Sequence, residues 1–407
     1  MRRRRTVMIV LVLFVLAFVS ACLPHIKKAE SVWTFMLYLN GDDAAVHPDY
    51  IMAFHDMIAK QVGSSEDVNI VIQFDRYKEM DDFGGWEIAH RFYYIPGMEP
   101  TEENAIADWG DGTGGREVNM ADPDTLSDFI HWASSNYPAE HYALMVASHG
   151  YGWRGLLIDV TSGGDFMTLK EFAGVLENSP VYFDVLAVNA CLMQMIEVLH
   201  ELRNSRCGVV VGSENDGKEW PIADIINALT RNPQISAEEW SKEIVDLYNS
   251  LHEGDEIITL SAVRLAEVPE LVDAFTEMVE VILGDEDFPI VQESAATVLQ
   301  ILEDAVVYKK NSAKWQDAGG ISIYWPELDQ DPVSIPHEYL YFYIDEITSF
   351  ARDALWRVFL WEYYRVMDTY PVIPHEIRRI RMELEEFEDP HVDLHQFLTA
   401  IVQYEDE

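Results

Sequence analysis

The sequence predicts an α/β fold built on a mostly parallel sheet. Two short apolar runs, at residues 142–148 and 183–190, are each bounded by turn residues, and such runs are typical of buried parallel strands. A segment with helical periodicity, at 167–176, lies between them. The spacing fits two neighbouring strands joined by a crossover helix, which is the basic unit of a parallel sheet.

Segments of the same two kinds alternate ahead of this unit. Each expected strand is a run of β-branched and aromatic residues that stops at polar turn residues. The run at 31–39, for example, stops at Asn40 and Gly41. A stretch rich in Gly, Pro, Asp and Glu is expected to be loop. In order, we expect a strand at 31–39, a helix at 48–62, strands at 68–74 and 88–95, a loop at 96–122 and a helix at 123–137.

Amphipathic segments dominate the second half of the chain. Trp356, Phe359, Leu360 and Tyr363 recur at the spacing of one helix face, which indicates core packing. The order expected after residue 190 is a helix at 192–202, a strand at 208–213, helical segments at 221–251 and 266–309 around a strand at 257–263, the last sheet strand at 319–326, and a helical C-terminal region.

The composition limits the classes of function. The chain has 407 residues, 49% of them apolar, which is enough for a large buried core. Acidic residues outnumber basic ones by 71 to 28, and the net charge of −43 argues against nucleic acid as a partner. Three cysteines are too few for a disulfide framework, and Cys207, at the entry to a strand, is expected to be buried.

The N-terminus has the features of an export signal. Four arginines at 2–5 precede an apolar run at 6–18 that is too short to span a membrane comfortably. The sequence VSAC at 19–22 then resembles the bacterial lipobox, in which the cysteine becomes the lipid-modified first residue of the mature protein. The alternative is an ordinary signal peptide with an incidental cysteine.

The lipobox resemblance has consequences for processing and location. It implies a lipoprotein signal peptide at 1–21, lipid on Cys22 and a short tether at 22–32. The protein would then be anchored by lipid in a bacterial cell envelope. Leu23 follows the cysteine, and by resemblance to known sorting signals this implies the outer membrane if the cell is Gram-negative.

An imidazole and a thiol follow the two central runs directly. His149 comes after the first run and Cys191 after the second, and function collects at the carboxyl ends of parallel strands. A thiolate is the reactive form of cysteine, and histidine is the side chain whose ordinary pKa lies nearest neutrality. The helix expected at 192–202 would place Cys191 at a helix N-terminus, which also favours a thiolate. This pattern predicts nucleophilic catalysis by Cys191, with His149 as its base.

Gly150 extends the predicted site. Without a side chain, its N–H can approach a substrate oxygen closely, and together with the Cys191 N–H it could form an oxyanion hole. For each residue alone a plainer interpretation exists, in which His149 closes a turn and Cys191 is a small buried hydrophobe. Their occurrence together, each at a strand end, favours the chemical interpretation.

Several segments in the same order resemble the clostripain family of cysteine peptidases, which are relatives of caspases, legumains and gingipains. The segments are WTFMLYLNGD (33–42), VIQFD (71–75), SHGYGWRG (148–155), NACLM (189–193) with Glu197, GSE (212–214) and GISIYWP (320–326). The resemblance implies a caspase-like three-layer α/β/α sandwich at 33–330, followed by a helical C-terminal extension at 331–407. By matching position, His149 would be the general base and acid, Cys191 the nucleophile, and Gly150 part of the oxyanion site.

The family resemblance also implies cleavage after basic residues. Family members usually carry Asp two residues before the nucleophile, where it helps to form the pocket for the basic side chain, but this chain has Asn189. An amide supplies no charge to pair with Arg or Lys. Glu214, Asp216 and Glu219 in the following loop could substitute, or they could be solvated loop charges. We therefore expect a weakened preference for basic residues.

Three functions fit these observations. The first is a lipid-anchored cysteine endopeptidase acting on protein or peptide substrates, with a membrane contact through its anchor. The second is a catalytically inactive, surface-tethered binding protein with a peptidase-like fold, and the third is another hydrolase or transferase that uses the same pair. No cofactor is expected, and no metal site is predicted because no compact acidic loop of the calcium-binding kind occurs.

Overall fold

The computed structural model describes residues 31–77, 82–109, 115–255, 258–284, 286–325, 348–365, 373–383 and 391–404. The expected signal peptide, Cys22 and all but the last two residues of the tether lie outside this part of the chain. The described residues from Ser31 onward form one compact unit. Within the described ranges, no helix combines the length and the apolar character needed to cross a bilayer.

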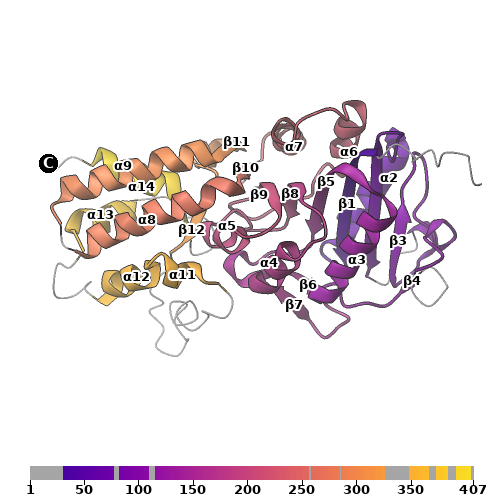
Figure 1. Cartoon of the computed structure of the whole chain (residues 1–407), viewed down its shortest axis with the longest axis horizontal. Coiled ribbons are helices and arrows are strands. Elements are labelled where there is room, and N and C mark those ends of the chain that lie inside the picture. Colours follow the sequence, from indigo (N-terminus) through magenta and orange to yellow (C-terminus); the bar gives the residue numbers. More distant parts are fainter. Residues whose placement is uncertain are drawn as a thin grey trace, which may run out of the picture. The chain divides into compact units, whose positions relative to one another are not determined.

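A nine-stranded sheet lies at the centre of the described chain (Figure 1). Its strands are β1 (Ser31–Gly41), β2 (Val68–Arg76), β3 (Ala89–Tyr93), β4 (Gly115–Arg116), β5 (Ala139–Ala147), β8 (Phe183–Asn189), β9 (Cys207–Gly212), β10 (Thr259–Arg264) and β11 (Val306–Asn311). Their order is β11-β10-β9-β8-β5-β1-β2-β3-β4. Neighbouring strands from β9 to β2 pair in parallel, and antiparallel pairs extend both edges.

Helices cover both faces of the sheet, which gives the three-layer α/β/α arrangement. They are α2 (His47–Lys60), α3 (Pro123–Asn136), α4 (Leu169–Glu177), α5 (Ile196–Leu202), α6 (Ile222–Arg231) and α7 (Ala237–Leu251). Along β1, Met36 and Tyr38 join the core beneath α3, α4 and α5. Phe35 and Leu37 join the opposite core beneath α2, α6 and α7. This alternation follows from the two-residue period of a strand, and it makes the central strands apolar on both faces.

The expected strand–helix–strand unit is present. Strands β5 and β8 are parallel neighbours, and α4 lies in the connection between them. Helix α4 begins at Leu169 because Thr168 and Glu171 form a capping box, in which each side chain accepts a backbone N–H of the other residue. Ahead of the helix, the sequence prediction missed an antiparallel hairpin of β6 (Gly155–Asp159) and β7 (Asp165–Thr168).

The amphipathic segment expected at 221–251 forms two helices, because α6 ends at Arg231 and α7 begins at Ala237, after a turn that contains Pro233. A further expectation needs correction. The strand expected as the last of the sheet, at 319–326, is β12 (Ser322–Tyr324) and belongs to a separate two-stranded sheet with β13 (His391–Asp393). The edge strand of the main sheet next to β10 is instead β11, whose first residues lie in the segment expected to be amphipathic at 266–309.

The C-terminal segment packs within the same compact unit. It contains α11 (Phe350–Asp353), α12 (Trp356–Arg365), α13 (His375–Glu383) and α14 (Leu394–Gln403). Two longer helices precede it, α8 (Val268–Leu283) and α9 (Phe288–Ala305). The apolar face expected on α12 is buried, and Trp356 contacts Trp325 with ring centroids 5.1 Å apart. The carboxylate of Asp393, at the end of β13, accepts a 2.6 Å hydrogen bond from the Gly319 N–H.

Candidate active site

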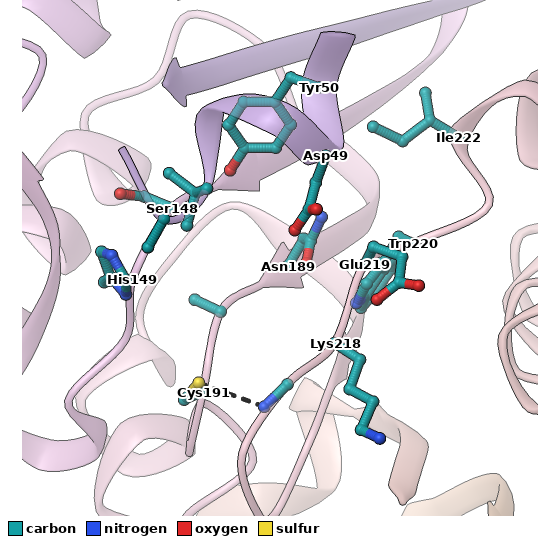
Figure 2. Close-up of a pocket in the computed structure, with 14 residues that line it drawn as sticks. Asp49, Tyr50, Ser148, His149, Asn189, Cys191, Lys218, Glu219, Trp220 and Ile222 are labelled. Atoms are coloured by element: carbon teal, nitrogen blue, oxygen red, sulfur yellow. Dashed lines mark hydrogen bonds between the residues drawn. The ribbon is translucent and has the colours of Figure 1, made fainter. Parts of the chain in front are cut away.

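The register of two central strands brings the imidazole and the thiol together. Ala147 at the end of β5 pairs with Asn189 at the end of β8. His149 and Cys191 each follow two residues later, so both leave the sheet at the same level of its carboxyl edge. Both line one cavity of about 340 Å³ (Figure 2). This is the edge at which open α/β sheets place their functional groups.

Close backbone contact fixes the residue type at position 150. A Cβ atom built on Gly150 would lie 2.8 Å from the Cys191 nitrogen and 2.9 Å from the Ala190 Cβ, closer than real side-chain atoms approach. Any larger residue would force the two strand-end segments apart. Gly150 therefore holds the backbone after the histidine against the backbone of the cysteine, which is the arrangement that a shared oxyanion site requires.

Cys191 is half-buried, and a backbone amide points at its sulfur. The Gly217 N–H donates to Cys191 Sγ over 3.2 Å, as the dashed line in Figure 2 marks. A hydrogen bond to the sulfur favours the thiolate over the thiol. Gly217 lies in the loop after β9, so the sulfur is stabilised by an amide of this loop and not by the N-terminus of a helix.

The expected helix dipole at Cys191 is absent. Helix α5 begins at Ile196, and residues 192–195 form a turn in which Leu192 has a φ of 62°. The Leu192 N–H bonds to the Asn215 carbonyl, and the Gln194 N–H bonds to the Ser213 carbonyl. The apolar periodicity of 192–202 reflects burial of this turn together with α5, so the prediction that Cys191 caps a helix was wrong.

An acidic residue that the sequence analysis did not single out contacts the histidine. His149 Nε2 lies 3.2 Å from Asp43 Oδ1, in the loop that follows β1. Burial alone would raise the pKa of Asp43, but hydrogen bonds from the Ala45 N–H and from His149 outweigh it and hold the pKa below its usual value. Asp43 is therefore ionised when it faces the imidazole. Applying the strand-end rule to β1 would have pointed to this residue.

The loop that carries Asp43 is tied to the β6–β7 hairpin. Asp42 accepts two 2.7 Å hydrogen bonds from the backbone N–H and the hydroxyl of Thr161. Burial raises the pKa of Asp42 to about 6, although these hydrogen bonds act in the opposite direction. Asn40 donates from its side chain to the Ile158 carbonyl over 2.6 Å. These contacts fix the position from which Asp43 meets His149.

The cavity lined by His149 and Cys191 is also lined by Asn189 and by two carboxylates. Asp49, from α2, and Glu219, from the loop after β9, both line it (Figure 2). Burial raises the pKa of Asp49, and the charge of Glu219 raises it further. Lys218 also lines the cavity, but its Nζ pairs with Asp255 over 3.0 Å. Asp49 was missed because it lies in the first turn of a helix, where an acid is ordinary.

The three loop acids have three different environments. Glu214 is fully buried and accepts a hydrogen bond from the Gly320 N–H over 3.0 Å, so the prediction that it reaches the substrate pocket was wrong. Burial, followed by the charge of Asp393, raises the pKa of Glu214 well above its usual value. Asp216 lines a second hollow beside Cys191, and Glu219 lines the cavity that contains Asn189.

The remaining cysteine of the described chain differs from Cys191. Cys207 begins β9 and is 6% exposed. Burial raises its pKa to about 12, so its thiolate is scarce at neutral pH. Across the ranges that the structure covers, no three or more His, Cys, Asp or Glu side chains are grouped in a way that could hold a metal ion.

Comparison with known proteins places this geometry in a family. The clostripain family model matches residues 38–353. Clostripain from Hathewaya histolytica is 32% identical over 106 residues, which cover 23% of this chain and 20% of that relative, so the match spans about a fifth of the relative's length.

Solved structures show the same fold. A secreted C11 cysteine protease from Bacteroides thetaiotaomicron, solved with an irreversible peptide inhibitor, has a TM-score of 0.61 at 18% identity and covers 80% of this chain and 99% of its own. An inactive zymogen C11 protease from Parabacteroides distasonis has a TM-score of 0.58 at 17% identity, with the same coverage. The family match spans most of the chain and includes both strand ends, and the chain therefore belongs to the clostripain family of cysteine peptidases.

Proposed function

We propose that this protein is a cysteine endopeptidase in which Cys191 is the nucleophile and His149 the general base and acid. The observation that carries the proposal is the register of β5 and β8, because it sets the two residues at equal distances beyond one paired position. The Asp43 contact at Nε2 supports the assignment, since it leaves Nδ1 of His149 to exchange a proton with the thiol.

The reaction would proceed in two halves. His149 takes the proton from Cys191, and the thiolate adds to the carbonyl carbon while the carbonyl electrons move to oxygen. The N–H groups of Gly150 and Cys191 would bind that oxyanion. His149 then gives its proton to the leaving nitrogen as the C–N bond breaks. A water molecule, deprotonated by His149, cleaves the thioester and restores the thiol.

A non-catalytic binding role is the second candidate, and Asn189 is the observation that favours it. The chain lacks the charge that family members usually carry two residues before the nucleophile. An active-site-directed thiol alkylator separates the two candidates, because it should label Cys191 much faster than the buried Cys207. A digest of a peptide library then separates a peptidase from another hydrolase or transferase. Equal, slow labelling of both cysteines together with an uncut library would rule the peptidase out.

The cavity that contains Asn189 would bind the side chain before the scissile bond. Asp49 and Glu219 support a basic side chain there. The pKa of Asp49 is raised first by burial and then by the charge of Glu219, and a cation between the two carboxylates would relieve the second cause. Asn189 contributes only a neutral acceptor. We therefore propose that the enzyme prefers Arg or Lys before the scissile bond, but less strongly than it would with Asp in place of Asn189.

Changing the pocket charge should change selectivity in both directions. We expect Asn189→Asp to raise kcat/KM for an Arg peptide relative to a matched Gln peptide by about 10-fold to 100-fold, since a charge-assisted hydrogen bond contributes roughly 1.5–3 kcal/mol. Glu219→Gln should lower the same ratio. Glu253→Gln, on an exposed carboxylate that does not line the cavity, is the control. A wild-type enzyme confined strictly to Arg and Lys and insensitive to Glu219→Gln and Asp49→Asn would contradict this account.

We also propose that the mature protein is held in the bacterial envelope by lipid on Cys22. The support is the VSAC sequence at 19–22 after a basic and apolar leader. Two or more acyl chains anchor a protein stably, whereas one chain binds only marginally. The native protein should partition into the detergent phase, and Cys22→Ala should remain unprocessed. Mass spectrometry that finds a lipid-free mature N-terminus beyond Cys22 would refute the anchor.

A further inference from the structure

Cys191 lies between two hollows. The first is the cavity that contains Asn189 and Glu219, and the second, of about 290 Å³, is lined by Gly150, Leu192 and Asp216 among others. Of the residues that line either one, Cys191 alone lines both. Cys191, whose sulfur would attack a peptide bond, thus borders two separate spaces.

The three segments that meet at Cys191 each divide between the hollows. After β5, Ser148 and His149 line the first and residues 150–154 contribute to the second. After β8, Asn189 and Ala190 line the first and residues 192–195 contribute to the second. The loop after β9 divides in the opposite order, with Asp216 in the lining of the second hollow and Gly217 in the lining of the first. In each segment the boundary between the hollows thus falls between neighbouring residues, and in the middle segment it falls at Cys191.

The walls of the second hollow are largely apolar and well packed. Trp153, Met195 and Tyr324 are each 2–3% exposed, and the rings of Trp153 and Tyr324 contact each other with centroids 5.3 Å apart. Leu192 adds a fourth buried side chain. Arg154 and Asp216 are the charged residues among those that line it, and the buried ring of His391 also lines it. The first cavity, in contrast, is lined by two carboxylates, those of Asp49 and Glu219, and by Lys218.

We propose that this second hollow is the subsite for the residue that follows the scissile bond, and that it selects a large apolar side chain. The proposal rests on the proposed peptidase function. With the scissile carbonyl carbon at Cys191 Sγ, the residue that supplies the carbonyl and the residue that supplies the leaving nitrogen extend to opposite sides of the sulfur. The charged cavity suits the first of these residues, so the apolar hollow receives the second.

The small sheet of β12 and β13 takes part in this subsite. Tyr324 belongs to β12 and His391 to β13, and these two residues pair directly in the small sheet outside the main one. The Tyr324 N–H also bonds to the buried carboxylate of Glu197 over 3.0 Å, which fixes the strand against α5. The segment beyond the main sheet thus supplies one wall of the space on the leaving side.

The test is a set of peptides that differ only after the cleaved bond. The residue before the bond is kept as the one that the library digest favours, and the next residue is Leu, Phe, Ser or Asp. We expect kcat/KM to be about 10-fold or more higher for Leu and Phe than for Ser and Asp, because filling an apolar pocket gives discrimination of this size. Met195→Ala should reduce that ratio by several-fold.

Two further variants keep the test independent of folding. Tyr151 is 39% exposed and lines the same hollow, so Tyr151→Ser should fold and should also reduce the ratio. Tyr182 is 50% exposed and lines neither hollow, so Tyr182→Ser should leave the ratio unchanged. Equal cleavage of all four wild-type peptides would overturn the subsite and leave the peptidase function standing. Cleavage of none of them, with no labelling of Cys191, would overturn both.

Discussion

Cys191→Ala and His149→Ala should each abolish peptide hydrolysis, with kcat lowered by roughly 10⁴-fold to 10⁶-fold. In the proposed mechanism the two side chains form one proton-transfer and nucleophilic unit, and loss of either member of such a unit removes most of its rate enhancement. The fold should persist, because both residues lie beyond the strand ends and neither is fully buried. The measurement is single-turnover cleavage of the best library peptide, with thermal unfolding of each variant measured in parallel.

Cys207→Ala is the matched control for this experiment. It removes the other described thiol, from the start of β9, and should leave kcat near the wild-type value with some loss of thermal stability because a buried side chain is shortened. Near-wild-type turnover by either dyad variant would show that the assignment is wrong. Loss of activity together with loss of the cooperative unfolding transition would assign that residue a structural role.

Asp43→Ala should lower kcat on the order of 100-fold or more, with KM little changed. The carboxylate faces His149 Nε2 and would hold the ring with Nδ1 toward the thiol while it stabilises the imidazolium that forms during reaction. Asp43→Asn keeps a hydrogen-bond acceptor without the charge, so it should recover part of the lost kcat. Steady-state kinetics on one peptide gives both parameters for each variant.

Asp56→Ala provides the comparison for the Asp43 series. Asp56 lies on the exposed face of α2 and pairs with Lys60, so its removal should leave both kinetic parameters near wild type. If Asp43→Ala raises KM and leaves kcat unchanged, the residue contributes to binding and does not position the imidazole. If Asp43→Asn is as inactive as Asp43→Ala, charge matters more than ring orientation.

The parts of the fold that follow from local pattern could be predicted from the sequence. The runs that became β1, β2, β5, β8 and β9 are apolar because parallel strands are buried on both faces, and that signal lies within each run. The meeting of His149 and Cys191 could be predicted for a related reason. Parallel neighbours end at the same edge, so two residues that each follow a strand end must lie near each other.

What could not be predicted depends on contacts between distant segments. The turn at 192–195 has the composition of a helix start, but hydrogen bonds to residues 213 and 215 pull it into another conformation. Glu214 and Glu219 are the same residue type within one loop, and only the path of that loop decides which is buried and which faces the cavity. Strand β12 pairs with β13, which lies far along the chain, and no local sequence pattern indicates this pairing.

The pairing of β12 with β13 also fixes when the site can be completed. A ribosome makes the chain from the N-terminus at roughly 5–20 residues per second, so every strand of the main sheet emerges before β13. Of the site residues, His391 and Asp393 arrive last, and with them come part of the wall beside Cys191 and the carboxylate whose charge raises the pKa of Glu214. The proposed nucleophile is thus made early and its surroundings late, so a chain that folds as it is made would carry the Cys191 thiol in an unfinished cleft until β13 has followed.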